Sequence, residues 1–232
     1  MTTLSIQQLA NLEPRPPVVV VIDVLRAFTT AAVAFAGHAD GIVLAASPDE
    51  ALRIRDRLPG ALAVKDGPPD PAFDAVNSPA EMDQLDVAGR TVVLATTNGT
   101  VGAVAADGAE LLVCASFVVA GATAAYLTRD GRPVTYVATG EDGRAEEDIA
   151  CAEYLAALLD GAALLDGAEV DPAPYLRRAR RSGLAERLTQ GARDGYPGIH
   201  ADDVDYCLAV DRYDFTMVAT RTGPDLVLRP LR

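Results

Sequence analysis

The chain has 232 residues, of which 50% are hydrophobic and 23% charged, so its composition excludes an intrinsically disordered protein and its length suits one α/β domain. Its 33 acidic residues exceed the 20 basic ones, and the net charge of −13 disfavours nucleic acids and other polyanions as partners. No apolar run reaches the roughly 20 residues that a membrane-spanning helix needs, so a membrane protein is not expected.

Short β-branched runs alternate with alanine-rich segments along the chain, a pattern typical of βαβ units and a largely parallel sheet. The run 18–22 (VVVVI) is apolar throughout, as expected for a strand whose two faces are both covered by helices. Further strands are predicted, in chain order, at 42–45, 61–65, 91–96, 110–115 and 133–138. The sequence therefore predicts an α/β fold.

Three helices are predicted between and after these strands: 26–35, a helix that begins after Ser47, and 146–159. Ser47 and Glu50 form a capping box, in which the serine caps the helix and the glutamate reaches back to the cap amide. A long loop rich in proline and glycine, 65–79, carries no regular pattern. Loops of this length are usually functional or disordered.

We expect one domain, 1–232. From about residue 161 the pattern changes to short helical pieces, so a smaller C-terminal lobe from this point is an alternative. The first residues lack the features of a signal peptide, and three cysteines are too few for a disulfide or zinc framework. We therefore expect a cytoplasmic protein, either monomeric or homo-oligomeric. Its densest basic segment is either the solvated face of a helix or a contact for an anionic substrate: Arg177, Arg178, Arg180 and Arg181.

Polar residues collect at the carboxyl ends of four predicted strands, where open parallel sheets bind their ligands. In chain order these ends carry Asp23, Arg26 and Thr30, then Thr97, Asn98, Gly99 and Thr100, then Ser116, and then the segment 139–143. Carboxylates, hydroxyls, an arginine and glycines at four neighbouring ends predict one shared site.

The segment TTNGT (96–100) lies between a buried strand and a helix. Gly99 allows a positive φ, so successive amides can converge on an anion, and the hydroxyls of Thr97 and Thr100 would add donors. An ordinary helix cap by Asn98 or Thr100 is the alternative. Because the GxxxxGK pattern is missing, hydrolysis of a nucleoside triphosphate is poorly supported.

Asp23 and Arg26 directly follow the apolar strand 18–22. A carboxylate in this place could hold a divalent metal or act as a nucleophile, and Arg26 could bind a phosphate through two parallel hydrogen bonds. The alternatives are an ion pair between the two side chains or a capping role for Asp23.

Glu147 and Asp148 stand at the start of the helix 146–159, where the helix dipole already favours carboxylates. Their spacing places both on the same face as Cys151, which we interpret as a core residue rather than a nucleophile. His38 is expected on the surface at a helix end, and His200 could approach the site from the C-terminal part. A second acidic cluster is predicted to form a solvated helix: Asp202, Asp203, Asp205, Asp211 and Asp214.

Together these segments resemble the magnesium-dependent 2-phosphosulfolactate phosphatases of coenzyme M biosynthesis. The matching stretches are VVIDVLRAFTT (ending at residue 30), FDAVNSP (73–79), TTNGT (96–100), ASF (115–117), TGEDGRAEEDIACA (139–152) and DDVDYCLAVDRYDFTMV (202–218). The resemblance implies an α/β/α sandwich, Mg²⁺ as cofactor and a small anionic phosphorylated substrate.

The resemblance also implies roles for individual residues. Asp23 and Arg26 would be catalytic, and Asp23, Glu147 and Asp148 would hold the metal. The substrate or its phosphate would be bound by Thr30, Asn77, Ser78, Thr97, Asn98, Gly99, Thr100 and Ser116.

The leading hypothesis is a Mg²⁺-dependent phosphatase that converts 2-phosphosulfolactate, or a similar phosphorylated 2-hydroxy acid, to the free acid and phosphate. The chain departs from the resembled pattern at SFVVAG (116–121) and at CAE (151–153), both beside the expected pocket. The alternatives are therefore a phosphatase of different specificity on the same scaffold and a noncatalytic protein that binds a phosphorylated metabolite.

Overall fold

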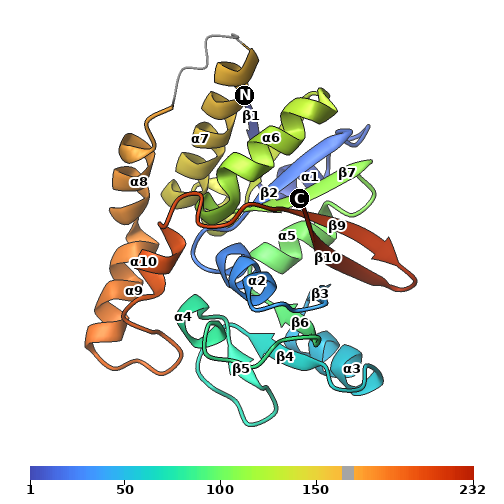
Figure 1. The fold of residues 1–232 in the computed structure, drawn as a ribbon, viewed down its shortest axis with the longest axis vertical. Coiled ribbons are helices and arrows are strands. Elements are labelled where there is room, and N and C mark those ends of the chain that lie inside the picture. The colour runs from blue at the N-terminus through green and yellow to red at the C-terminus, as the bar shows by residue number, and fades with distance from the viewer. Residues whose placement is uncertain (164–169) are drawn as a thin grey trace.

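The computed structural model describes residues 1–163 and 170–232, whose strands form a single ten-stranded sheet (Figure 1). The strand order is β1-β8-β2-β7-β9-β10-β3-β6-β4-β5. The strands are β1 (Thr2–Leu4), β2 (Val18–Ile22), β3 (Gly41–Ala45), β4 (Leu62–Lys65), β5 (Ala75–Val76), β6 (Thr91–Ala95), β7 (Leu111–Ala115), β8 (Val134–Ala138), β9 (Thr216–Thr222) and β10 (Asp225–Leu231).

The helices lie between and after these strands. They are α1 (Ile6–Ala10), α2 (Ala27–Ala36), α3 (Pro48–Arg57), α4 (Pro79–Met82), α5 (Gly99–Ala105), α6 (Ala120–Asp130), α7 (Glu146–Ala163), α8 (Ala173–Arg180), α9 (Gly183–Arg193) and α10 (Asp203–Cys207), with 3₁₀ turns at Phe117–Val119 and Gly140–Gly143. The α/β class and the six strands expected from the sequence are confirmed, with ends that differ by one residue at most.

The sheet consists of two parallel halves joined by an antiparallel hairpin. Strands β1, β8, β2 and β7 pair in parallel, as do β3, β6, β4 and β5. Between the halves, β9 pairs antiparallel with β7, and β10 pairs antiparallel with β3. The sequence analysis predicted no strand in this part of the chain, because the partners of the hairpin lie more than a hundred residues away.

Helices cover both faces of the sheet, and α2 packs in the core on one of these faces. Along β2, Val19 and Val21 point into a core that contains α2 and side chains of β3, β6 and β4 from the other half. Val18, Val20 and Ile22 point to the opposite face, towards α6 and α7. Because side chains alternate along a strand, an all-apolar β2 follows from having packed layers on both sides. Figure 1 shows α2 near the centre of the molecule and α6 and α7 over the other face.

The predicted helices are present with small changes. Ser47 caps α3 by accepting from the Glu50 amide at 3.2 Å, but the Glu50 carboxylate accepts from the Ala46 amide instead of that of Ser47. The loop 65–79 includes the short strand β5 and the first residue of α4. Its final segment is therefore fixed in place beside β4.

The basic segment of α8 forms the solvated helix face that one of its two interpretations predicted. Arg178 pairs with Glu146 at 2.8 Å and with Glu153 at 2.6 Å, and Arg180 pairs with Asp205 at 2.8 Å. The division of the chain into one domain with a smaller lobe from about 161 stays a prediction. None of the helices within 1–163 and 170–232 is long and apolar enough to span a membrane.

Candidate active site

Asp23 lies at the junction between β2 and α2, at the end of the most apolar strand, and is 7% exposed. Its Oδ1 accepts a hydrogen bond from the Ala27 amide at 3.1 Å, and its Oδ2 accepts one from the Thr139 hydroxyl at 3.3 Å. Asp23 therefore bonds the first turn of α2, as its capping alternative expected. The ion pair between Asp23 and Arg26 is absent from the described structure, since Arg26 has another partner.

Burial raises the pKa of Asp23 to about 7, and the nearby negative charges of Asp66 and Glu147 contribute to the rise. The hydrogen bonds from Ala27 and Thr139 lower it, but not enough to compensate. An ionised carboxylate in an apolar setting is unfavourable unless a cation or further donors accompany it. A cation bound beside Asp23 would therefore favour its ionised form.

Asp148 lies next to Asp23 and is bonded mostly to backbone amides. Its Oδ1 accepts from the Val24 amide at 2.9 Å, and its Oδ2 accepts from the amides of Thr139 at 3.2 Å and Gly140 at 3.0 Å. These bonds fix the carboxyl ends of β2 and β8 relative to α7. Burial, followed by the charges of its acidic neighbours, raises the pKa of Asp148 well above its ordinary value.

Glu147 is also buried, at 2% exposure, on the first turn of α7. It bonds the side chain of Ser182, which caps α9, and burial raises the pKa of the glutamate. The charge of Glu147 acts on both Asp23 and Asp148. The structure therefore joins Asp23 and Asp148 through the Thr139 hydroxyl, with the charge of Glu147 nearby, but it does not place all three carboxylates around one ion.

The donor set fits Mg²⁺ better than a metal held entirely by protein. In the described part of the chain, no group of three or more His, Cys, Asp or Glu side chains is placed to ligate one ion. Mg²⁺ is usually bound through one or two carboxylates together with waters and substrate phosphates. Asp23 and Asp148, which both contact the Thr139 hydroxyl and both have raised pKa values, can supply those carboxylates.

Ionisation of Asp23 leads to a prediction about stability. In its folded state this group keeps its proton up to about pH 7, whereas in the unfolded chain its pKa is near 3.8. Between these values the folded state binds more protons, so the free energy of unfolding must fall as pH rises. We expect the metal-free protein to lose stability from pH 5 to pH 8, with Asp23 contributing up to about 1.4 kcal/mol per pH unit.

Urea unfolding in EDTA at both pH values measures this loss, and Asp23→Asn provides the reference. The difference in unfolding free energy between wild type and variant should shift in favour of the variant as pH rises. A difference that does not change with pH would contradict the raised pKa of Asp23.

Arg26 is buried at 8% exposure, and its Nη1 donates to Asp203 Oδ2 at 2.6 Å and to the Gly198 carbonyl at 2.9 Å. Asp203 is itself fully buried at the start of α10. The prediction of a solvated acidic helix was therefore wrong for Asp203, and Asp211 and Asp214 lie beyond the end of α10, although Asp202 and Asp205 are exposed as expected. Spacing along the chain could not show the difference, because the partner of Asp203 is 177 residues away.

Asn77 and Ser78 connect this region to the loop that precedes α4. The Ser78 hydroxyl donates to Asp203 Oδ1 at 2.6 Å, and it also caps α4. Asn77 Nδ2 donates to Asp66 Oδ1 at 2.8 Å. Both residues expected from the resemblance thus lie beside acidic groups that the sequence analysis had not placed in the site.

The segment 96–100 has the geometry of a local cap. Thr100 Oγ1 accepts from the Thr96 amide at 2.8 Å and donates to the Thr96 carbonyl at 3.1 Å, so this hydroxyl is engaged within its own turn. Asn98 stands at the helix start without a side-chain cap bond. The Thr97 amide donates to Asp66 Oδ2 at 2.7 Å. Of this segment, only the Thr97 amide is shown bonding a carboxylate.

Gly99 is required by a close approach and not by its dihedral angle. The expected positive φ is absent, because Gly99 is not among the residues in the left-handed region. A Cβ on this residue would lie 2.6 Å from the Ala27 Cβ and 2.7 Å from Asp23 Oδ2. The glycine thus lets α5 pack directly against the β2–α2 junction.

We expect Gly99→Val to displace Asp23 or α5 and to lower both stability and kcat/KM, the latter by about 10²-fold, because small misplacements of reacting groups are that costly. Thermal unfolding and steady-state kinetics measure the two effects. Ala125→Val, at an exposed position of α6, is the control for the kinetics. Normal turnover by a folded Gly99→Val enzyme would show that the contact has no role in the site.

Three of the expected binding residues have buried polar atoms without a hydrogen-bond partner within the described residues: Thr30 Oγ1, Asn77 Oδ1 and Ser116 Oγ. Thr30 lies one turn after Arg26 on α2, and Ser116 follows β7, the neighbour of β2. Buried polar groups are almost always bonded, so orphaned ones need an explanation. A bound ligand or water that supplies the missing partners provides it.

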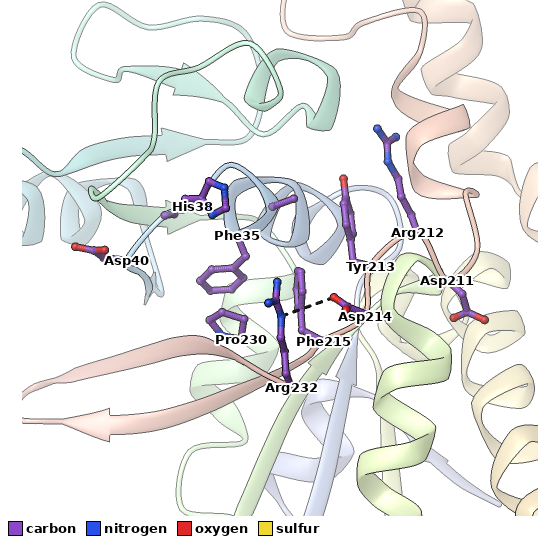
Figure 2. A pocket seen from close by; sticks show the side chains of 12 residues that line it. Phe35, His38, Asp40, Asp211, Arg212, Tyr213, Asp214, Phe215, Pro230 and Arg232 are labelled. Carbon is purple, nitrogen blue, oxygen red and sulfur yellow. Dashed lines mark ion pairs between the residues drawn. The ribbon is translucent and has the colours of Figure 1, made fainter.

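Two pockets lie near these elements. A pocket of about 530 Å³ is lined by Lys65, Asp66, Thr96 and Thr97, among other residues. A larger pocket of about 630 Å³ lies between the end of α2 and the C-terminal residues, and Figure 2 shows its aromatic floor of Phe35 and Phe215. None of the described lining residues of this larger pocket is an expected site residue. Of the expected site residues only Thr97 lines the smaller pocket, and neither pocket is lined by Asp23 or Arg26, so the site is the buried cluster around these two residues.

The remaining expectations concern a cysteine and the two histidines. Cys151 is fully buried, as expected for a core residue, and His38 is exposed after the end of α2. His200 is exposed and reaches the site only through its backbone amide, which donates to Asp203.

The sequence analysis did not place Asp66 or Asp203 in the site, and it included Thr139 only as part of the segment 139–143. Thr139 stood at a strand end that had been singled out, and Asp66 stood in the loop interpreted as functional or disordered. The sequence shows where these residues stand in the chain, but it does not show which distant residues they contact.

Comparison with known proteins identifies the family of this chain. The sequence family described as 2-phosphosulpholactate phosphatase matches residues 4–222. A protein of Deinococcus radiodurans named "Probable 2-phosphosulfolactate phosphatase" is 36% identical over 92% of this chain and 93% of its own length. Proteins with the same name from Carboxydothermus hydrogenoformans (34%, 90% of this chain, 87% of that protein) and Bacillus subtilis (31%, 88% and 87%) are also similar. The chain belongs to the 2-phosphosulpholactate phosphatase family.

Proposed function

We propose that this protein is a phosphoric monoester hydrolase that converts 2-phosphosulfolactate and water to sulfolactate and phosphate. The names of its relatives support this substrate. The observation that carries the proposal is the placement of Asp23 and Arg26 at the end of β2. Within the described residues, a carboxylate without a cationic partner and a guanidinium with free donors stand three residues apart at one strand end.

Arg26 provides a positive charge for binding an anionic substrate to an acidic protein. A chain with a net charge of −13 repels a substrate that carries several negative groups, so binding needs a local cation. Arg26 is buried beside the orphaned hydroxyl of Thr30 on the same helix. A guanidinium in a water-poor site stabilises charge on a phosphoryl group more strongly than it could in water.

The metal belongs to the proposal as well. Asp23 and Asp148 would hold Mg²⁺, with the charge of Glu147 nearby, because these buried carboxylates have raised pKa values and no ion-pair partner within the described residues. When bound, Mg²⁺ would polarise the phosphoryl oxygens and neutralise their charge. The amides that bond Asp148 keep its carboxylate oriented whether or not the ion is present.

We expect EDTA to abolish phosphate release and added Mg²⁺ to restore it. The site offers carboxylates, which Mg²⁺ prefers, and not the His and Cys ligands typical of zinc. Release of phosphate from 2-phosphosulfolactate, followed during chelation and re-addition of Mg²⁺ or Zn²⁺, measures this. Full activity after exhaustive chelation would remove the metal from the mechanism.

A panel of small phosphate monoesters tests the reaction and its specificity together. The panel contains 2-phosphosulfolactate, 2-phospholactate, 2-phosphoglycerate and a simple alkyl phosphate, each with and without Mg²⁺. Fastest release from 2-phosphosulfolactate supports the proposal. Preference for another ester points to a different specificity on the same scaffold, and tight binding without release points to a noncatalytic protein.

The wider setting is a separate part of the proposal and rests on the resemblance found in the sequence. We place the reaction in the biosynthesis of coenzyme M and the protein in the cytoplasm. The three buried cysteines, Cys114, Cys151 and Cys207, are all free thiols, as is usual for proteins of a reducing compartment.

A further inference from the structure

Asp203 forms a connected set of hydrogen bonds at the start of α10. Its Oδ1 accepts from the Ser78 hydroxyl at 2.6 Å and from the Ala80 amide at 3.3 Å. Its Oδ2 accepts from Arg26 Nη1 at 2.6 Å and from the His200 amide at 3.0 Å. One fully buried carboxylate therefore joins the start of α2 to α4 and α10, and Figure 1 shows α4 between the other two helices.

These bonds leave one edge of the guanidinium free. Nη1 has two protons, and both are used, one by Asp203 and one by the Gly198 carbonyl at 2.9 Å. Within the described residues, neither Nε nor Nη2 of Arg26 donates a hydrogen bond. Nε and Nη2 form the side edge of the guanidinium, which matches two oxygens of a phosphate or carboxylate. The carboxylate on Nη1 thus fixes the direction in which the free edge points.

Stability alone does not account for this arrangement. A buried ion pair often adds nothing to stability relative to apolar residues of the same shape, because desolvation of both charges offsets their attraction. The pair does hold a side chain with several rotatable bonds in one orientation. The backbone around it is closely packed, since a Cβ on Gly198 would lie 2.5 Å from the Gly67 carbonyl oxygen. The segment that carries Asp203 is therefore held against the loop that carries Asp66.

We propose that Asp203 is a positioning residue, which holds Arg26 through Nη1 so that the Nε–Nη2 edge binds the oxyanion of the substrate. The inference rests on the proposed function for the identity of the reaction but not for the binding of an anion. It makes the C-terminal segment 198–207 part of the machinery that acts on the phosphate.

A double-mutant cycle tests the coupling. Asp203→Asn keeps the shape of the side chain and removes its charge, and we expect kcat/KM to fall by about 10²-fold through loss of orientation. Because the loss acts through Arg26, the double variant Arg26→Lys with Asp203→Asn should be no worse than Arg26→Lys alone. Asp205→Asn, an exposed acid two residues further along α10, is the matched control and should behave as wild type.

Chemical rescue gives a second test that remains usable if Asp203→Asn alone fails to fold. Arg26→Ala with Asp203→Asn removes both charges, so no unpaired charge stays buried. Guanidinium, kept far below denaturing concentrations, should restore activity to Arg26→Ala, where Asp203 can still bind and orient it. The double variant should not be rescued. Equal rescue of both variants, or additive losses in the cycle, would overturn the positioning role.

Binding of inorganic phosphate separates this proposal from the proposed reaction. Titration calorimetry with phosphate should show about tenfold or greater loss of affinity in Asp203→Asn and none in Asp205→Asn, at the scale of one charge-assisted hydrogen bond. If wild type binds phosphate in this manner but hydrolyses no ester, the positioning role stands and the reaction is wrong. If Asp203→Asn binds phosphate and turns over as wild type does, the positioning role is wrong and the reaction stands.

Discussion

Asp23→Asn should lower kcat by 10²-fold or more while the protein still folds. The substitution is nearly isosteric: the amide oxygen can still accept from the Ala27 amide, and the amide nitrogen that replaces Oδ2 can donate to the Thr139 hydroxyl oxygen. It removes the one charge that is placed by the rigid end of β2 and lacks a cation among the described residues. Loss of a major electrostatic or nucleophilic group is expected to have this size. Steady-state kinetics at saturating Mg²⁺ measures the change.

Two further measurements distinguish the roles open to Asp23. If it binds the metal, the affinity for Mg²⁺ falls together with kcat. If it is a nucleophile, wild type quenched during turnover carries a hydroxylamine-labile phosphoryl group that the variant lacks. Asp56→Asn, at an exposed position of α3, is the control. A folded Asp23→Asn enzyme with normal turnover would place this residue outside the mechanism.

Arg26→Lys should reduce kcat/KM by about 10²-fold and leave the fold intact. Lysine keeps the positive charge and can still pair with Asp203, which explains why stability should survive. It cannot keep one nitrogen on Asp203 and offer two more, in a fixed plane, to an oxyanion. The effect of losing a single preorganised donor is of this order.

Parallel kinetics and thermal unfolding of Arg26→Lys, with Arg180→Lys as the control, check this result. Arg180 is 56% exposed and pairs with Asp205 on the surface, so its exchange should change neither quantity. A variant with wild-type kcat/KM would reduce Arg26 to a structural partner of Asp203.

The local elements were predictable because their causes are local. The run VVVVI predicted β2 without error, since only a strand with two covered faces is apolar at every position. Ser47 predicted the start of α3, since a cap bond spans only three residues. Asp23, Arg26 and Ser116 were expected in the site for a similar reason, because parallel strands present their carboxyl ends at one edge.

Contacts and strand pairings between residues far apart in the chain could be seen only in the tertiary structure. The acids at 202–214 have similar local sequence, yet only Asp203 meets Arg26 and Ser78, which lie 177 and 125 residues away. The insertion of β9 and β10 between the two parallel halves likewise depends on pairing with β7 and β3. Gly99 was expected for its dihedral freedom, but the reason it is needed is contact with Asp23 and Ala27 from another strand–helix junction.

The sequence by itself therefore determined the α/β class, most strands, and the residue types that meet at the strand ends, because periodicity and capping act over a few residues. Only the tertiary structure decided which carboxylate pairs with the arginine and which stays without a cation. Burial and Coulomb interactions depend on distance in space, and for Asp23, Arg26 and Asp203 that distance bears no relation to their separation along the chain.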